Sequence, residues 1–175
     1  MRNVLMALLF QLGWFACVTS GARGQPVFAL AAAAAVIAGN LRLQRRCWAT
    51  ETRLLAQVTL IGVGIESLHL WAGVCTLSGE PHYPWLCPAW LAVLWTMFAT
   101  LLRGPLVWLK GRYALSALLG ATFAAPNYIA GARLGAVTLS SNTLFSVAAL
   151  MASWSLAMPV MVWLAATPGP AREIR

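Results

Sequence analysis

The fold of this chain is decided by residues 54–78, LLAQVTLIGVGIESLHLWAGVCTLS, an apolar run that contains a single acidic side chain, Glu66. A helix that crosses a membrane needs about 20 mostly apolar residues, so this run is long enough to span one. The whole chain of 175 residues is 61% hydrophobic and only 9% charged, whereas a soluble domain is about 45–50% apolar and about 25% charged. The composition therefore excludes a soluble domain, and its richness in Trp and Leu excludes a disordered chain.

Five further apolar runs flank the first, and all of them are separated by short polar or basic connections. They predict an all-α, polytopic membrane protein, a bundle of six transmembrane helices in a single domain over residues 1–167, followed by a short polar cytoplasmic tail over residues 168–175. We expect the first run to remain in the protein rather than to be cleaved as a signal peptide. In chain order the six runs are Val4–Ser20, Pro26–Leu43, Leu54–Ser78, Leu86–Leu102 with an extension toward Leu109, Tyr113–Ala136 and Thr143–Ala166.

The basic residues predict how this bundle is oriented. Lys and Arg total 12 and Asp and Glu total 4, and excess Lys and Arg mark the cytoplasmic side of a membrane protein. One side of the predicted bundle has only Arg23 and Arg133, so we expect both termini to be cytoplasmic, in the bacterial inner membrane. The other side collects Arg2, Arg42, Arg45, Arg46, Arg53, Arg103, Lys110, Arg112, Arg172 and Arg175.

Glu66 is the first candidate functional residue, because a charged side chain near the bilayer centre costs at least about 2.5–3.5 kcal/mol. We expect it to face the interior of the bundle, where it is paired, hydrated or protonated. His69 follows one turn later on the same face, so the two side chains can share a proton or satisfy each other's hydrogen bonds. Small and polar residues continue this face at helical spacing, namely Thr59, Gly62, Gly73 and Thr76.

Arg133 and Asn127 are the other two candidates, both in the fifth run. Arg133 either extends to the membrane surface or pairs with Glu66, although straight helices place the two on the order of 12 Å apart in depth. Pro126 can break the helix and change that distance. Asn127 is expected beside Glu66 and His69 in a lipid-accessible cavity, and Gly131 with Gly135 forms a weak helix-packing motif.

The four cysteines, Cys17, Cys47, Cys75 and Cys87, have neither CxxC spacing nor neighbouring histidines. This pattern predicts neither a metal site nor a bound cofactor. Cys75 and Cys87 flank a Pro-rich hairpin on the predicted periplasmic side, where a disulfide is allowed if their Cα atoms lie within about 7 Å. Two small buried residues are the favoured alternative, and Cys47 is expected to be a free thiol.

Several short strings together resemble a family of small bacterial inner-membrane proteins catalogued as domain of unknown function 2878. The resemblance covers nearly the whole chain and transfers no catalytic residue. Because genes of that family lie beside enzymes resembling cyclopropane-fatty-acid synthases and flavin-dependent amine oxidases, it implies a role near membrane-lipid modification. Family members carry Asp more often than Glu in the third helix. The strings are Phe10–Cys17, Glu66 to Gly73, Trp90 to Leu101, Trp108–Arg112 and Tyr128–Gly135.

Three functions remain open from the sequence. The first is a component of a membrane-lipid modification pathway, acting as an enzyme or a scaffold, which predicts a lipid-accessible cavity around Glu66. The second is a small proton-coupled transporter or permease, and the third is a structural or assembly protein in which Glu66 is merely hydrogen-bonded. The expected partners are membrane lipids, membrane-lipid-modifying enzymes and a second copy of the chain, and nucleic acid is not among them, since the basic loops are explained by topology.

Overall fold

The structure is a computed structural model that describes residues 1–44, 48–78 and 83–167. Cys47, the basic residues Arg45, Arg46, Arg172 and Arg175, and the predicted tail at 168–175 lie outside the described residues. Within the described part, six α-helices account for most of the chain, which confirms the predicted helical class. They are α1 (Arg2–Ala22), α2 (Pro26–Gln44), α3 (Trp48–Trp71), α4 (Ala89–Leu102), α5 (Tyr113–Arg133) and α6 (Thr143–Ala166).

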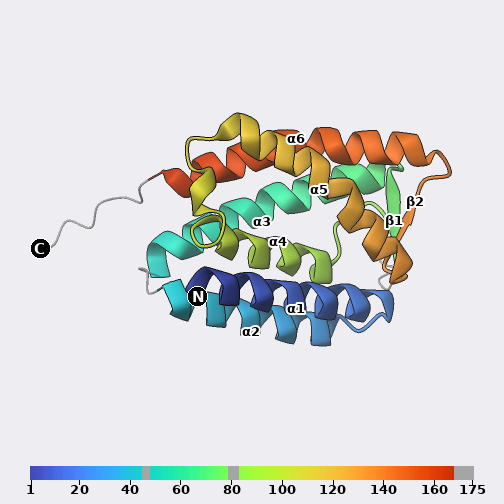
Figure 1. The fold of residues 1–175 in the computed structure, drawn as a ribbon. Coiled ribbons are helices and arrows are strands. Elements are labelled where there is room, and N and C mark those ends of the chain that lie inside the picture. Colours follow the sequence, from blue (N-terminus) through green and yellow to red (C-terminus); the bar gives the residue numbers. More distant parts are fainter. Residues whose placement is uncertain (45–47, 79–82, 168–175) are drawn as a thin grey trace, which may run out of the picture.

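The described helices run back and forth along the bundle, with α5 inclined to the others, and the N-terminus and the end of α6 lie at the same end of it (Figure 1). Helix α1 packs against α2 and α4, and α3 packs against α4, whereas α5 packs chiefly against α6. The basic side chains of the described residues follow this arrangement. Six of them, Arg2, Arg42, Arg53, Arg103, Lys110 and Arg112, belong to the end that holds the N-terminus, and Arg23 and Arg133 belong to the other.

Four helices are long and apolar enough to cross a membrane, namely α1, α2, the segment Glu51–Trp71 of α3, and α6. Helix α4 is apolar but has only 14 residues, about 21 Å of helix against about 30 Å of bilayer hydrocarbon. The predicted extension of the fourth run to Leu109 is wrong. The chain leaves the helix after Leu102 and forms a short 3₁₀ turn, η1 (Val107–Leu109), because Gly104 and Pro105 follow and proline cannot continue the hydrogen-bond ladder.

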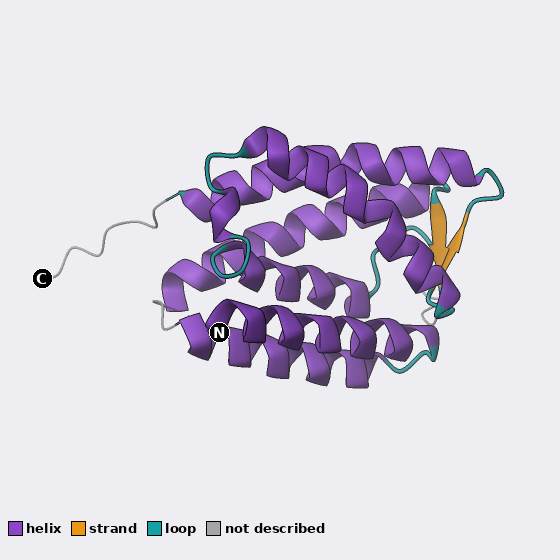
Figure 2. Ribbon diagram, in the orientation of Figure 1, coloured by secondary structure: helices purple, strands orange, loops and turns teal. Residues whose placement is uncertain are grey.

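The third run ends as a strand rather than as a helix, which corrects its predicted helical end at Ser78, and the connection that follows the fifth run forms the partner strand. Strand β1 (Cys75–Leu77) pairs antiparallel with β2 (Val137–Leu139), with Thr76 opposite Thr138. Figure 2 shows this small sheet at the end of the bundle away from the N-terminus. Gly73 turns the chain out of α3 with φ at +67°, a backbone conformation that glycine adopts without steric cost. Gly73 and Thr76 therefore do not belong to the helical face that contains Glu66.

Pro126 does not break the fifth helix, because α5 continues through it to Arg133. The expected packing motif at Gly131 and Gly135 is also not formed between helices, since Gly135 follows the end of α5 with φ at +80°. The close helix approach occurs instead at Gly120, where an added Cβ would lie 2.3 Å from the backbone oxygen of Trp154. Glycine at this position lets α5 and α6 touch through their backbones.

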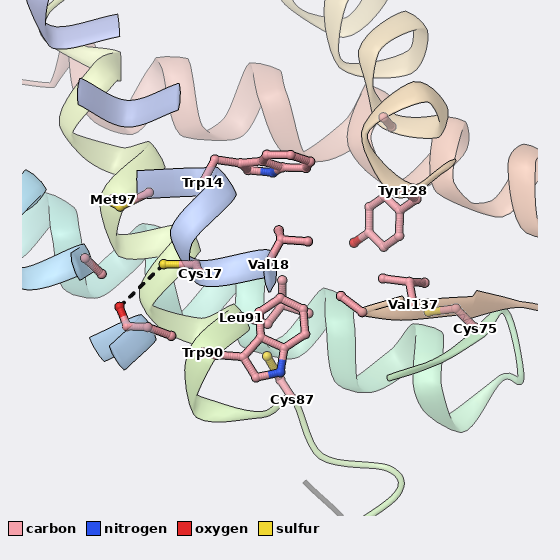
Figure 3. Packing of buried hydrophobic residues seen from close by; sticks show 14 of the residues in the cluster. Trp14, Cys17, Val18, Cys75, Cys87, Trp90, Leu91, Met97, Tyr128 and Val137 are labelled. Atoms are coloured by element: carbon pink, nitrogen blue, oxygen red, sulfur yellow. Dashed lines mark hydrogen bonds between the residues drawn. The ribbon is translucent and has the colours of Figure 1, made fainter. Parts of the chain in front are cut away.

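The outer surface of the bundle is strongly apolar, as expected for a protein that faces lipid. Large exposed hydrophobic side chains occur on α1, α2, α3, α5 and α6, and examples are Leu12, Phe28, Leu60, Phe123 and Leu156. The buried core gathers smaller side chains with several tryptophans (Figure 3). A surface of this extent remains stable in a bilayer and would aggregate in water.

Cys75 is a free, buried thiol in β1, so the Cys75–Cys87 disulfide is not formed. Burial raises the pKa of the Cys75 thiol from an ordinary 9.0 to about 12. The thiolate is the reactive form, and at pH 8 its fraction falls from about one in ten to about one in 10⁴. We expect reduction to leave the masses of the Cys75 and Cys87 peptides unchanged, and maleimide to label Cys75 at least about a hundredfold faster in SDS than in the native protein. Rapid native labelling would show that Cys75 is accessible.

Candidate functional site

Glu66 lies about one and a half turns before the end of α3, closer to the β-sheet end than the middle of the bundle, and only 1% of it is exposed. Its Oε1 accepts hydrogen bonds from the Tyr128 hydroxyl of α5 and from the Trp95 indole Nε1 of α4, the latter at 3.2 Å. Three helices therefore converge on one carboxyl group. Buried polar groups are stable when they are paired in this way.

Gly62 explains why Trp95 can reach Glu66. Gly62 and Glu66 are four positions apart on the same face of α3. An added Cβ on Gly62 would lie 2.1 Å from the Trp95 ring. Only glycine leaves room for the indole to lie against the helix there. The second face of the ring stacks on Trp154 of α6, with centroids 4.5 Å apart and planes inclined by 19°.

His69 connects Glu66 to α6. Its Nδ1 lies 3.5 Å from Glu66 Oε2, and its Nε2 lies 2.9 Å from the Ser153 hydroxyl. The Ser153 hydroxyl itself donates to the Leu150 carbonyl at 3.0 Å. Glu66, His69 and Ser153 therefore form a continuous line of polar contacts from α3 to α6.

A cavity of about 500 Å³ lies beside this network and is lined by Glu66, Asn127 and Tyr128 together with mostly apolar residues of α1, α4, α5 and α6. Along α4 it extends from Trp90 to Leu101, about 17 Å at the rise of an α-helix. Trp14 and Val18 of α1 lie across from Tyr128 of α5 in Figure 3. The volume falls in the range of small-molecule and lipid sites, about 300–1,000 Å³.

The four residues predicted from the sequence have different positions relative to the cavity. Glu66 and Asn127 line it, while His69 is buried behind Glu66 and does not. The Asn127 amide donates to the Phe123 carbonyl at 2.7 Å. Arg133 is exposed at the end of α5, and the ion pairs of the described residues do not join it to Glu66, so the pairing alternative is not realised there.

Two partners of Glu66 were missed by the sequence prediction. Tyr128 follows Asn127 directly, and a tyrosine next to an asparagine within an apolar run was a usable signal for a polar site. Trp95 carried no such signal, because tryptophan is common in membrane helices for packing alone.

A second buried polar contact, also not predicted, lies at the other end of the bundle. Arg103 Nη1 donates to Glu51 Oε1 at 3.1 Å, and the two side chains are 8% and 2% exposed. Arg103 also donates to the backbone oxygens of Ala165 and Thr167 at 2.9 and 3.3 Å. This contact fastens α3 and the end of α4 to the end of α6 and lies away from the cavity lining.

Comparison with curated proteins and with solved structures finds no match. A family model does match, over residues 3–160, and its description is a protein of unknown function. The match covers all six helices except the last turns of α6, and it confirms the family expected from the sequence strings. The chain therefore belongs to the family described as protein of unknown function DUF2878.

Proposed function

We propose that this protein is a multi-pass bacterial inner-membrane protein that binds a lipid in the cavity beside Glu66, as a component of a membrane-lipid modification pathway. The observation that carries the proposal is a cavity of about 500 Å³ whose walls are apolar except at a few side chains around Glu66. Ligand sites of this kind use apolar walls for affinity and a small number of polar groups for orientation. A purely structural role for Glu66 would call for tight packing around it instead.

The way into the cavity supports a lipid rather than a water-soluble ligand. Its walls come from α1 and α4 on one side and from α5 and α6 on the other, and α5 packs chiefly against α6 rather than against α1. Phe123 of α5, which lines the cavity, is 62% exposed. An opening between α1 and α5 would face acyl chains in a membrane, so a lipid would enter sideways from the bilayer.

Lipid profiling tests this function. A strain that lacks the gene should show an altered pattern of membrane lipids, and the wild-type gene should restore it. Ala124→Phe, which places a phenyl ring in the cavity from a buried position on α5, should fail to restore it. Ala114→Phe, an exposed position on the same helix, serves as the matched control and should restore it fully. An unchanged lipid pattern in the deletion strain would contradict the proposal.

Proton-coupled transport is the second candidate function. It is favoured by the chain of contacts that leads from the cavity wall at Glu66 through His69 to Ser153, since titratable groups in series are used for proton relays in membranes. Glu66→Gln removes the titratable proton while it keeps the shape of the side chain. Under the transport hypothesis this variant should lose proton-driven uptake, whereas lipid binding in the cavity should persist.

The proposed topology has six membrane spans with both termini in the cytoplasm. It is supported by the N-terminus and the end of α6, which lie at a common end, and by the excess of basic residues there (Figure 1). A reporter that is active only in the periplasm should work when fused after Glu80 and should fail when fused after Arg45 or Arg112. The opposite pattern of activity would contradict the proposed orientation.

A further inference from the structure

We infer that the lipid bound in this cavity is uncharged and carries a hydroxyl or carbonyl group. The inference rests on the proposed function, because it names the chemical class of ligand for the same site. It follows from three features of the cavity, which are the charges on its wall, the hydrogen bonds that Glu66 already accepts and the hydrogen-bonding capacity that remains for a ligand.

The wall offers no cation to an acidic lipid. Among the described residues that line the cavity, none is Lys, Arg or His, and Glu66 is the one acidic side chain. An unpaired carboxylate, sulfate or phosphate placed among apolar side chains costs far more than a neutral polar group. Arg133 is exposed and Arg103 is held by Glu51 away from the lining, so neither compensates an anion there.

The wall also leaves little of the Glu66 carboxyl group open to a cationic lipid. The lone pairs of Oε1 are occupied by Tyr128 and Trp95, and Oε2 faces His69. Trp95 and Trp154 stack on each other, so these two rings present fewer open faces to an ammonium group than an aromatic cage would.

The remaining hydrogen-bonding capacity suits a neutral group. The Tyr128 hydroxyl donates its hydrogen to Glu66 and has the Trp154 indole beside it, whereas the Trp90 indole Nε1, also in the cavity wall, is a buried donor that has no partner within the described residues. Asn127, one residue earlier on α5, uses one amide hydrogen for the Phe123 carbonyl, and its Oδ1 has no protein partner within the described part of the chain. A hydroxyl group on the ligand can donate to Asn127 Oδ1 and accept from a donor in the wall. A carbonyl group on the ligand can accept from the Asn127 amide.

Three probes with the same oleyl chain separate these possibilities. They are oleyl alcohol, oleyl sulfate and oleyltrimethylammonium, whose charges do not depend on pH. The full-length protein in detergent is titrated with each probe, and bound probe is measured by native mass spectrometry. We expect oleyl alcohol to bind at least about tenfold more tightly than either charged probe, a difference of about 1.4 kcal/mol.

Two cavity-filling variants show where the probes bind. Ala124→Phe on α5 and Leu91→Trp on α4 fill the cavity from opposite walls, and either should reduce binding of oleyl alcohol at least about tenfold, whereas Ala114→Phe should not. Asn127→Leu should weaken the binding of oleyl alcohol about three- to tenfold. Thr122→Val, a change at an exposed position on the same helix, should leave this binding unchanged. Gel filtration of each variant checks that it folds.

The outcomes distinguish the two proposals. Binding that is sensitive to the cavity-filling variants but equal for all three probes, or tighter for a charged probe, would overturn the uncharged class and leave the lipid site standing. Binding of no probe, or binding that neither variant changes, would overturn both. Because the preference is measured on the wild-type protein, it does not depend on the folding of any variant.

Discussion

Replacing Glu66 with leucine is expected to lower the free energy of unfolding by about 2–5 kcal/mol. Leucine leaves the Tyr128 hydroxyl and the Trp95 indole without an acceptor, and both side chains are buried. A buried donor that loses its partner costs about 1–3 kcal/mol, although interhelical hydrogen bonds in membranes average nearer 0.6 kcal/mol. For a chain of this size the loss corresponds to a fall in Tm of roughly 5–15 °C.

Glutamine at the same position is the matched control. Its carbonyl oxygen can accept from Tyr128 and Trp95, so it keeps the two hydrogen bonds that the leucine variant loses. We expect Glu66→Gln to change the free energy of unfolding by less than about 1 kcal/mol. Thermal unfolding of the purified protein in detergent measures both variants. A leucine variant as stable as the glutamine variant would show that the three-helix network does not form.

Breaking the Glu51–Arg103 pair should have an effect of similar size, through a different mechanism. Arg103→Met removes the cation and leaves the Glu51 carboxyl buried without its partner, and loss of one member of a buried pair costs about 3–5 kcal/mol. It also removes the donors to Ala165 and Thr167 at the end of α6. We expect a fall in Tm of about 6–15 °C, measured by the same thermal unfolding.

The double variant separates the pair from the other contacts of Arg103. Glu51→Leu combined with Arg103→Met removes both charges, so it should be more stable than Arg103→Met alone. Arg53→Met, a change at an exposed arginine two residues after Glu51, should alter Tm by no more than about 2 °C. A double variant that is less stable than either single variant would contradict the view that the cost comes from an unpaired buried charge.

Much of the helical framework is predictable from the apolar runs, because hydrocarbon offers no hydrogen-bond partners to backbone groups. Every amide that faces lipid must be hydrogen-bonded within its own segment, so a long apolar run has to be a helix. This is why the predicted starts at Pro26, Tyr113 and Thr143 coincide with the starts of α2, α5 and α6. Asn142 caps α6 with its side chain, as its residue type predicts.

The sheet was not predictable in the same way. Residues 75–77 and 137–139 are as apolar as the helices that precede them. No local feature of the sequence distinguishes these strands from those helices. Their hydrogen bonds join segments about 60 residues apart, and such pairing leaves no periodic pattern in so short a run. The prediction therefore extended the third helix to Ser78 and placed Glu66 nearer the middle of the bundle than it is.

For the candidate site, the sequence by itself determined that Glu66 is buried inside the bundle and that His69 is beside it. The cost of a charge in lipid and the three-residue spacing on a helix are both local properties. Only the tertiary structure decided which groups surround the carboxyl. Trp95 and Tyr128 lie 29 and 62 residues away in sequence, and they reach Glu66 because Gly62 admits the indole and because α5 packs on α6 at Gly120. The cavity, likewise, is the space left between packed helices, and its shape depends on side chains from five of the described helices.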